Sequence, residues 1–437
     1  MASMIEIEKE FRRISGFVCP FCGALCDDLV VETDGKEIRV ENACVLGTSK
    51  ILARYHRRVL KPQIDGKEVD LEKAIEKSAE ILVKAKKPLF YGFSSTTCEA
   101  QELAVELAEI VGGVIDCTSS VCHGPTILAV HEVGVPSFTL GEVKNRADLV
   151  IFWGCNPMHA HPRHMSRYSV FTRGRFAQSR IGRKVVVVDV RPTESSKLAD
   201  LFIQIKPGSD YEIFNALRSI VNTGECRSEN GEIGGVKVEK LKELAEMMKN
   251  CKFGVIFFGM GLTHSAGNYW NISEAISLVK DLYRFTKFGI MPMRGHYNVT
   301  GFNEVCTWET GYPFAVDFTK GYPWYNPGET DANSILSRRD ADAMFVLGGD
   351  PAAHFPKATV DYMKKIPLIV VDPFWSLTAS IANILIPSAV AGVEAGGSAY
   401  RMDAVPLKLR KIVDPPDGVL SDEEILKMLI EKVEEIS

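Results

Sequence analysis

The stretch Ala147-Asp-Leu-Val-Ile-Phe-Trp-Gly-Cys-Asn-Pro157 determines the fold, because the chain contains this pattern twice. The second copy is Ala341-Asp-Ala-Met-Phe-Val-Leu-Gly-Gly-Asp-Pro351. In each copy an apolar run ends in Gly, and Asn or Asp followed by Pro comes two residues later. A continuous apolar run is typical of a strand that is buried on both faces of a parallel sheet. The Gly and Pro that follow it are typical of a turn leading into a helix.

The repeat extends beyond this pattern. Each copy is followed by a second apolar run that ends in Asp, Val186–Asp189 in one case and Ile369–Asp372 in the other. Similar segments come next, Lys197–Ile203 and Ser380–Ile386. Turn chemistry alone explains isolated Gly and Pro residues, but it does not explain elements that recur in the same order. We therefore predict two homologous α/β lobes, which hold two similar ligands or two similar halves of one ligand.

The rest of the chain alternates strand-like and helical patterns, which predicts parallel α/β sheets. An amphipathic helix is expected over Leu71–Ala85 and a strand over Pro88–Phe93. The clearest predicted strands are Leu149–Trp153, Val185–Val190, Gly254–Phe258, Ala343–Leu347 and Leu368–Val371. The fold class is therefore α/β, with two Rossmann-like lobes and a small cysteine-bearing domain at residues 1–60.

That N-terminal domain contains a four-cysteine motif. Cys19, Cys22 and Cys26 have C-x2-C-x3-C spacing, and Cys44 follows after 17 intervening residues. Four thiolates select an iron–sulfur cluster or zinc. Structural zinc usually takes two C-x2-C knuckles, so the x3 spacing and the isolated fourth cysteine favour a [4Fe–4S] cluster. The alternatives are structural zinc and four cysteines that share no ligand.

Composition excludes several classes of protein. The 437-residue chain has a net charge of −5 and 24% charged residues, and it has no basic run that would support nucleic-acid binding. Its N-terminus lacks the apolar core of a signal peptide, and no apolar stretch is long enough to span a bilayer. Eleven cysteines without an export signal predict a reducing compartment, so we expect a cytoplasmic location.

A second cysteine of interest lies in Thr118-Ser-Ser-Val-Cys-His-Gly-Pro125. This segment is typical of a loop entering a helix, with Pro125 near the first helical position. A thiolate near a helix N-terminus has a lowered pKa and is a good nucleophile or metal ligand, which makes Cys122 and His123 candidate catalytic residues. The competing interpretation is a buried cysteine beside an exposed histidine.

Two further polar segments are candidates. Met293-Arg-Gly-His-Tyr-Asn-Val-Thr-Gly301 is predicted to be a loop in which Arg294 holds a carboxylate, unless it is a solvated surface turn. In Met158–His164, the histidines are spaced poorly for zinc. We interpret those histidines as surface or cofactor-adjacent residues.

Candidate cofactor-binding residues follow the predicted strands, where open α/β sheets bind ligands. Glycines there allow close backbone approach and exposed amides, and acidic residues at the next strand ends can meet a ribose or base edge. The chain has no G-x-G-x-x-G, which disfavours an ordinary NAD-binding domain. The candidates are Gly154, Asn156, Pro157, Asp189, Gly259, Gly261, Gly348, Asp350 and Asp372.

Together these segments resemble the molybdopterin oxidoreductase superfamily over residues 17–406, and within it the formate dehydrogenase-like family of formylmethanofuran dehydrogenase B subunits. In that superfamily the N-terminal cysteines hold a [4Fe–4S] cluster, which matches Cys19, Cys22, Cys26 and Cys44. A Val-Cys-His-Gly-Pro loop supplies the protein ligand to the metal, matching Cys122. The motif Arg-Gly-x-x-Asn-Val-x-Gly supplies an active-site arginine, matching Arg294, and His296 lies in the same motif.

The resemblance implies tungsten or molybdenum held by two molybdopterin guanine dinucleotides. It also implies that residues 61–125 and 295–437 form a first, discontinuous pterin-dinucleotide lobe and that residues 126–294 form a second. The implied activity is reversible reduction of CO2 to formate, in methanogenic C1 metabolism, by an oxidoreductase with an iron–sulfur acceptor. Formate would then pass to an amidohydrolase subunit for condensation with methanofuran.

Two departures from the family pattern bear on partners. Related formate dehydrogenases have Lys two residues after the fourth cysteine, where this chain has Leu46, although Lys50 is nearby. Complete members continue into a barrel-like domain, which we expect to be missing here and to be supplied by a pterin-covering subunit. Polyferredoxin or other iron–sulfur subunits are further expected partners. The alternatives are another formate dehydrogenase-like catalytic subunit, a non-catalytic electron-transfer scaffold of the same fold and a zinc-stabilised binding module.

Overall fold

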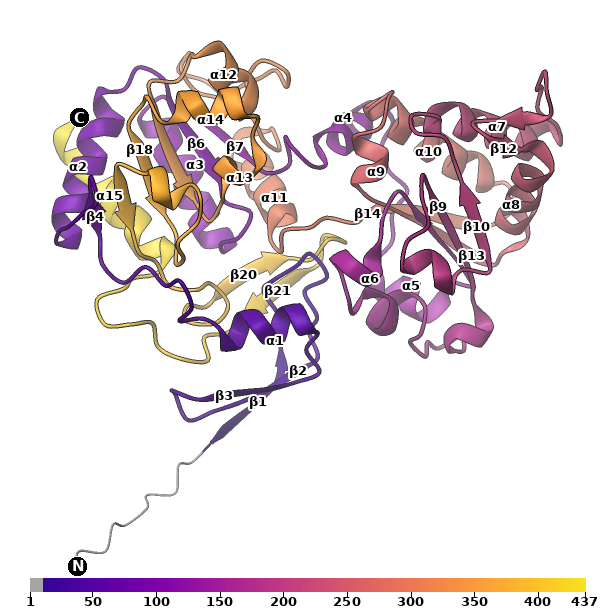
Figure 1. Cartoon of the computed structure of the whole chain (residues 1–437), viewed down its shortest axis with the longest axis horizontal. Helices are drawn as coiled ribbons and strands as arrows, with labels where there is room; N and C mark the ends of the chain where they lie inside the picture. The colour runs from indigo at the N-terminus through magenta and orange to yellow at the C-terminus, as the bar shows by residue number, and fades with distance from the viewer. Residues whose placement is uncertain (1–10) are drawn as a thin grey trace, which may run out of the picture.

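The computed structural model describes residues 11–437, and Figure 1 shows two α/β lobes side by side above a small cysteine-bearing unit. That unit is a three-stranded antiparallel sheet followed by one helix. Its elements are β1 (Arg12–Phe17), β2 (Leu29–Thr33), β3 (Ile38–Glu41) and α1 (Val45–Leu52). The first three motif cysteines lie in the loop between β1 and β2, and Cys44 caps the N-terminus of α1.

The first lobe is built on a nine-stranded sheet of order β16-β15-β7-β6-β17-β18-β19-β4-β5. The five strands from β7 to β19 are parallel, and short antiparallel strands extend both edges. The bounds are β4 (Gln63–Ile64), β5 (Lys67–Glu68), β6 (Pro88–Gly92), β7 (Val114–Cys117), β15 (Val316–Asp317), β16 (Trp324–Tyr325), β17 (Ala343–Leu347), β18 (Leu368–Val371) and β19 (Ile384–Ile386).

Helices cover both faces of this sheet. Phe90 and Phe345 point into one core with helices α2 (Leu71–Lys84), α3 (Cys98–Ile110), α11 (Val299–Thr310) and α15 (Asp422–Ile436). Their strand neighbours Leu89 and Met344 point to the opposite face, against α12 (Ala332–Arg338) and α14 (Lys357–Met363). This alternation explains why the strands are apolar at every position.

The second lobe has a five-stranded, fully parallel sheet of order β10-β9-β8-β13-β14. Its strands are β8 (Leu149–Trp153), β9 (Lys184–Asp189), β10 (Leu201–Gln204), β13 (Phe253–Phe258) and β14 (Lys287–Pro292). One face packs against α4 (Gly124–Val133), α7 (Asp210–Thr223), α8 (Val238–Asn250) and α10 (Tyr269–Leu282). The other face shares a core with α5 (Leu140–Arg146) and with the cysteine-bearing unit.

Short elements complete the described chain. They are α6 (Pro157–Ala160), α9 (Met260–Thr263), α13 (Pro351–His354), the π-helical turn η1 (Met165–Ser169), the 3-10 turns η2 (Ser179–Gly182), η3 (Ser195–Leu198) and η4 (Ala379–Ile381), and the hairpins β11 (Glu232–Ile233) with β12 (Val236–Lys237) and β20 (Gly397–Tyr400) with β21 (Pro406–Leu409). Within residues 11–437 no sheet closes into a barrel. No helix of the described chain is both long and apolar enough to cross a membrane.

Both sheets have a topological switch point. In the first lobe it lies between β6 and β17, and in the second it lies between β13 and β8. The carboxyl ends of neighbouring strands at such a point lead to helices on opposite faces, which opens a ligand-binding crevice. The repeated turns of the sequence follow β8 and β17, so they lie at these two crevices.

The predicted α/β class and the predicted strands are confirmed. One local expectation is wrong, because the segment 293–301 is only partly a loop. Helix α11 begins at Val299 and includes Thr300 and Gly301.

Candidate functional site

The two repeated turns have matching backbones. Gly154 and Gly348 have φ angles of +56° and +59°, a left-handed conformation that favours glycine. Each is followed by a four-residue helix, α6 or α13, that starts with proline. A Cβ at Gly154 would meet the backbone of Gly261 at 2.9 Å, so the turns after β8 and β13 touch.

The polar residue of each turn secures the turn itself. Ser195 Oγ donates a hydrogen bond of 2.6 Å to Asn156 Oδ1, and Thr378 Oγ1 donates one of 2.6 Å to Asp350 Oδ1. The same two hydroxyls accept from the backbone amides of the short helices. This correspondence shows that the repeat is structural as well as sequential. It also means that the Asn156 and Asp350 side chains already have partners within the protein.

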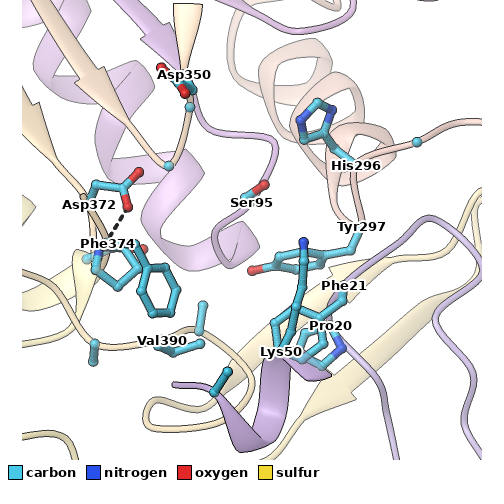
Figure 2. A pocket seen from close by; sticks show the side chains of 18 of the residues that line it. Pro20, Phe21, Lys50, Ser95, His296, Tyr297, Asp350, Asp372, Phe374 and Val390 are labelled. Atoms are coloured by element: carbon cyan, nitrogen blue, oxygen red, sulfur yellow. Dashed lines mark hydrogen bonds between the residues drawn. The ribbon is translucent and has the colours of Figure 1, made fainter. Parts of the chain in front are cut away.

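A cavity of about 580 Å³ lies at the switch point of the first lobe, and Figure 2 shows its lining. We call it the first-lobe cavity. Backbone from Gly348 and Gly349 borders it together with Ser95, which follows β6. The wall opposite comes from the cysteine-bearing unit, through Phe21 and helix α1. The cavity therefore joins the repeated turn to the surroundings of the four cysteines.

Lys50 of α1 lines this cavity beside His296 and Tyr297. Its Nζ lies 5.5 Å from the centroid of the Phe21 ring. Its charge also acts on the Cys22 thiol, where it lowers the pKa against a larger raising effect of burial. Lys50 thus places a cation between the cavity and the cysteine loop, one helical turn after Leu46.

Carboxylates line the same cavity. Asp372 accepts a hydrogen bond of 2.8 Å from the Phe374 amide, and burial raises the pKa of Asp372 to about 7. Burial also raises the pKa of Asp422, whose Oδ1 has no hydrogen-bond partner in the described protein. An unpartnered, buried acceptor at a cavity wall is suited to a ligand that donates hydrogen bonds.

A second cavity, of about 590 Å³, lies where the two lobes meet, and we call it the seam cavity. Cys122 and Thr118 line it from the first lobe, and Thr263 and His264 line it from the second. Thr263 Oγ1 donates a hydrogen bond of 2.8 Å to the Cys122 carbonyl, so the second lobe holds the cysteine loop. His296 and His354 border both this cavity and the first-lobe cavity, so they form a wall that the two cavities share.

Arg294 is the main cation near Cys122. Burial raises the pKa of Cys122 to about 11, and the Arg294 charge opposes that increase. Burial in turn lowers the pKa of Arg294, and the Cys122 and Cys117 thiols act against that decrease by raising it. Arg294 Nη1 also donates to Asn303 Oδ1, which fixes the guanidinium. Cys122 and Arg294 are therefore neighbours that favour each other's charged forms.

Two histidines of this region, His123 and His296, have pKa values below the ordinary value. Burial lowers the pKa of His123 to about 3 and that of His296 to about 4. His123 Nδ1 lies 3.1 Å from Thr126 Oγ1, while its Nε2 has no partner among the described residues. The competing sequence interpretation, a buried cysteine beside an exposed histidine, is wrong. His123 is only 1% exposed, whereas Cys122 is the partly exposed residue of the pair.

The cysteines of the N-terminal motif lie near one another. A Cβ at Gly47 would lie 3.0 Å from Cys19 Sγ and 3.9 Å from Cys44 Sγ, and the Gly47 amide donates to Cys44 Sγ over 3.4 Å. Burial raises the pKa of Cys26 to about 12, with a further increase from Cys22. Neighbouring thiolates repel one another and so disfavour each other's charged form, and a bound metal cation removes this repulsion. This set of donors therefore suits a metal group.

A site for a single metal ion is a separate question from a cluster site. Across residues 11–437, no three or more His, Cys, Asp or Glu side chains are close enough together to hold one metal ion. The histidines of segment 158–164 form no such site either. Of the two interpretations of these histidines, the surface location is wrong for His161 and His164, which are 2% and 0% exposed, and the cofactor-adjacent location stays a prediction.

The other predicted residues occupy different places. Asp189 is half-buried at the end of β9, where burial raises its pKa, and neither Asp189 nor the turn at Gly154 borders the two cavities. Gly259 and Gly261 flank the start of α9, next to the seam-cavity residue Met260.

Sequence reasoning missed Asn303 and Thr263, which support the site, and it considered His161 only as one histidine of the segment Met158–His164. His161 Nε2 lies 2.8 Å from the Arg294 carbonyl oxygen, and Asn303 holds the Arg294 side chain. Asn303 follows Arg294 by nine residues, which is a local signal. Thr263 is distant in sequence from Cys122 and has no such signal.

Comparisons with known proteins agree with this architecture. A family model described as molybdopterin oxidoreductase matches residues 72–432. The B subunit of the tungsten-containing formylmethanofuran dehydrogenase 2 of Methanocaldococcus jannaschii is 52% identical over 97% of this chain and 99% of the relative. The protein of the same name from Methanococcus maripaludis is 50% identical over 96% of this chain and 98% of the relative.

A solved structure shares the fold at low identity. It is a chain of the formyltransferase/hydrolase complex of Methylorubrum extorquens in complex with methylofuran. The match has a TM-score of 0.71 and 19% identity, and it covers 86% of this chain and 99% of the other. The family model and the two relatives extend over most of the chain. The chain therefore belongs to the molybdopterin oxidoreductase family and, within it, to the formylmethanofuran dehydrogenase B subunits.

Proposed function

We propose that the chain is the catalytic subunit of a formylmethanofuran dehydrogenase and interconverts CO2 and formate. The observation that carries the proposal is the pairing of Cys122 and Arg294 at the seam between the lobes. A soft thiol facing a cavity and a fixed guanidinium beside it are the two protein groups that this reaction needs. The relatives of 50% and 52% identity, whose names state this enzyme and tungsten, support the assignment.

The residues present fit the cofactor that the family implies. A tungsten or molybdenum ion bound by two pterin guanine dinucleotides supplies the two-electron redox chemistry when it is bound. Cys122 would hold the metal from the wall of the seam cavity. The first-lobe cavity, with the Gly348 backbone and the half-buried Asp372, would take one dinucleotide. The turns at Gly154 and Gly259 would take the other, because they occupy the switch point of the second sheet.

Arg294 binds and orients the carboxylate of formate in this proposal. A guanidinium forms charge-assisted, paired hydrogen bonds with a carboxylate, and these strengthen in a site that excludes water. Asn303 holds the guanidinium from one side and His161 lies against the Arg294 backbone, so the donor is oriented before the substrate arrives. Arg294 also favours the thiolate form of Cys122, the form that binds a metal.

His123 and His296 act as hydrogen-bonding groups rather than as charges. Their pKa values of about 3 and about 4 keep both imidazoles neutral at pH 7. The free Nε2 of His123 can accept or donate one hydrogen bond according to its tautomer. The neutral His123 would form a hydrogen bond with the group that carries the proton in the interconversion of CO2 and formate, and Arg294 supplies the positive charge of the site.

Electron transfer and formate transfer complete the proposed function. Cys19, Cys22, Cys26 and Cys44 would hold a [4Fe–4S] cluster, which would supply one-electron transfer toward iron–sulfur partner subunits. Lys50 lies between those cysteines and the first-lobe cavity. Formate would leave for an amidohydrolase subunit that condenses it with methanofuran, and a further subunit would cover the pterins. We place the complex in the cytoplasm.

The test is anaerobic purification of the complete complex, followed by analysis of tungsten, molybdenum, iron, acid-labile sulfide, zinc and pterin. A viologen-coupled assay with formate then measures the redox half-reaction. We expect tungsten or molybdenum with pterin, and formate-dependent viologen reduction. Zinc without either metal and without pterin would refute the proposal, as would a pterin-loaded complex that does not oxidise formate.

A further inference from the structure

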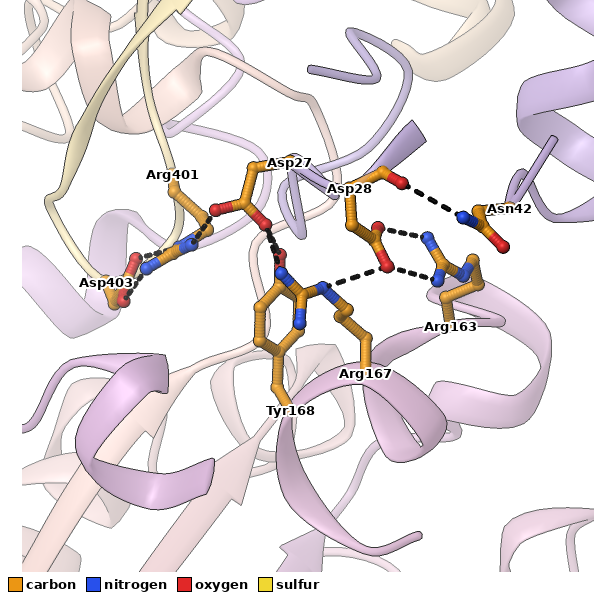
Figure 3. A network of polar contacts seen from close by, with 8 residues as sticks. All are labelled: Asp27, Asp28, Asn42, Arg163, Arg167, Tyr168, Arg401 and Asp403. Atoms are coloured by element: carbon orange, nitrogen blue, oxygen red, sulfur yellow. Dashed lines mark hydrogen bonds and ion pairs between the residues drawn. The ribbon is translucent and has the colours of Figure 1, made fainter. Parts of the chain in front are cut away.

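The loop that carries Cys26 is fastened to the second lobe by an ion-pair network, shown in Figure 3. Asp27 and Asp28 follow Cys26 directly. Arg163 makes a two-pronged contact with Asp28, through hydrogen bonds of 2.6 and 2.7 Å. Arg167 donates a bond of 2.7 Å to Asp27 and lies 3.3 Å from Asp28. Both arginines thus meet the residues next to a motif cysteine.

Further contacts and partial burial hold this network in place. Arg167 lies within the π-helical turn Met165–Ser169, a form that is frequent at functional sites, and Arg163 precedes it. Arg401 approaches Asp27 to 3.8 Å and is itself held by Asp403, whose side chain is 0% exposed. The Arg163 and Asp28 side chains are only 20% and 29% exposed. Partial burial of this kind keeps their charges from being fully screened by solvent.

These charges lie close to Cys26. Asp28 follows Cys26 by two residues, and its two hydrogen bonds with Arg163 hold the guanidinium against the same loop. The pair is formally neutral, so its effect at the cysteine changes sign according to which of the two charges is removed.

We propose that Arg163 is a positioning residue that raises the reduction potential of an iron–sulfur cluster on Cys26, and that Asp28 opposes it. The inference rests on the proposed function, which assigns a [4Fe–4S] cluster to these cysteines. Reduction adds one electron to the cluster, so a nearby cation stabilises the reduced form and a nearby anion destabilises it. The pairing with Asp28 holds the guanidinium at a fixed place beside the cysteine.

The two halves of the pair make the test decisive. Removing either charge breaks the same ion pair, so a merely structural effect would act in one direction for both variants. The electrostatic effect has opposite signs. Arg163→Gln leaves Asp28 with Arg167 as its remaining cation and shifts the midpoint potential to more negative values. Asp28→Asn leaves Arg163 uncompensated and shifts it to more positive values.

The measurement is an anaerobic potentiometric titration of the complete complex, with dithionite as the electron donor and the electron paramagnetic resonance signal of the reduced cluster as the readout. Arg163→Lys keeps the charge and is expected to restore most of the potential. Arg218→Gln is the matched control, because Arg218 also binds two carboxylates, at 2.7 and 2.9 Å, but does so between helices α7 and α10. It is expected to leave the potential unchanged.

Shifts of the same sign in Arg163→Gln and Asp28→Asn, or no shift in either, would overturn the inference while leaving the cluster assignment intact. A wild-type complex that contains no iron and no cluster signal would overturn the cluster assignment as well. If Arg163→Gln fails to assemble, the sign of the Asp28→Asn shift and the potential of Arg163→Lys decide the question.

Discussion

A single methyl group at Gly23 would separate two functional loops. Gly23 lies between Cys22 and Cys26, and its amide donates a hydrogen bond of 3.0 Å to the Gly295 carbonyl. A Cβ on Gly23 would lie 2.3 Å from the Arg294 carbonyl oxygen, whereas ordinary contact begins at 3.4 Å, so the loops must part by about 1.1 Å. Gly23 does not have a positive φ, so the perturbation in Gly23→Ala is purely steric.

The expected changes in stability and in reaction rate follow from that distance. Overpacking of a close contact costs about 1–3 kcal/mol of unfolding free energy, and displacement of a catalytic group by about 1 Å lowers the rate on the order of 10²-fold. We therefore expect Gly23→Ala to fold, to keep its iron and to oxidise formate about 10²-fold more slowly than wild type in the viologen assay.

Gly396→Ala is the control, because its nearest neighbour, the Leu409 carbonyl oxygen, would lie at an ordinary 3.5 Å. This variant is expected to behave as wild type. Wild-type rates and thermal stability in Gly23→Ala would show that the contact between the cysteine loop and Arg294 does not position Arg294 for the proposed reaction.

Three further predictions concern the core and the site. Arg58→Met leaves Glu394, whose side chain is 0% exposed, without its ion-pair partner at 2.6 Å. The unfolding free energy measured by urea denaturation should fall by about 3–5 kcal/mol, and the double variant Arg58→Met/Glu394→Leu should recover most of that loss. A double variant in which the two losses simply add would contradict the pairing. The pKa of Asp372 is raised from 3.8 to about 7 by burial, so its contribution to stability is complete below about pH 4 and is lost as the pH rises through 7. Asp372→Asn should therefore lose less unfolding free energy than wild type between pH 5 and 8, by at most about 1.4 kcal/mol per pH unit, and parallel curves would refute this origin. Cys122→Ala should lose metal and formate oxidation while keeping its melting temperature, because only the thiolate ligand is removed, whereas Cys226→Ala should keep both; full activity in the first variant would exclude the ligand role.

Strands buried on both faces were the most predictable elements. The expected strands Leu149–Trp153, Ala343–Leu347 and Leu368–Val371 match the structure to the residue. Their sequences are apolar at every position because both faces of each sheet are covered, and their ends are marked by Gly or Asp. The two-residue edge strand Trp324–Tyr325 has no such pattern and was not predicted, since it depends on pairing with Val316–Asp317.

Local polarity does not predict loops or exposed side chains reliably where tertiary contacts satisfy the polar groups. Asn298, Thr300 and Gly301 are typical loop residues, yet helix α11 begins among them. Asn298 donates to the Thr96 carbonyl over 2.8 Å and accepts from the Tyr400 amide over 2.8 Å, so its polar groups are used by distant segments. His164 is also buried, and its ring makes an edge-to-face contact with the Phe257 ring, with 4.7 Å between the ring centroids.

The amino-acid sequence by itself determined the α/β class, the doubled strand–turn pattern and the candidate residues Cys122 and Arg294, because these features depend on local order and spacing. Only the tertiary structure decided which of those residues meet. It placed Arg294 beside Cys122, Lys50 at the first-lobe cavity and Arg163 against Asp28. Arg163 and Asp28 are 135 residues apart. No period in the sequence specifies such a pairing, because it arises only when the cysteine-bearing unit packs on the second sheet.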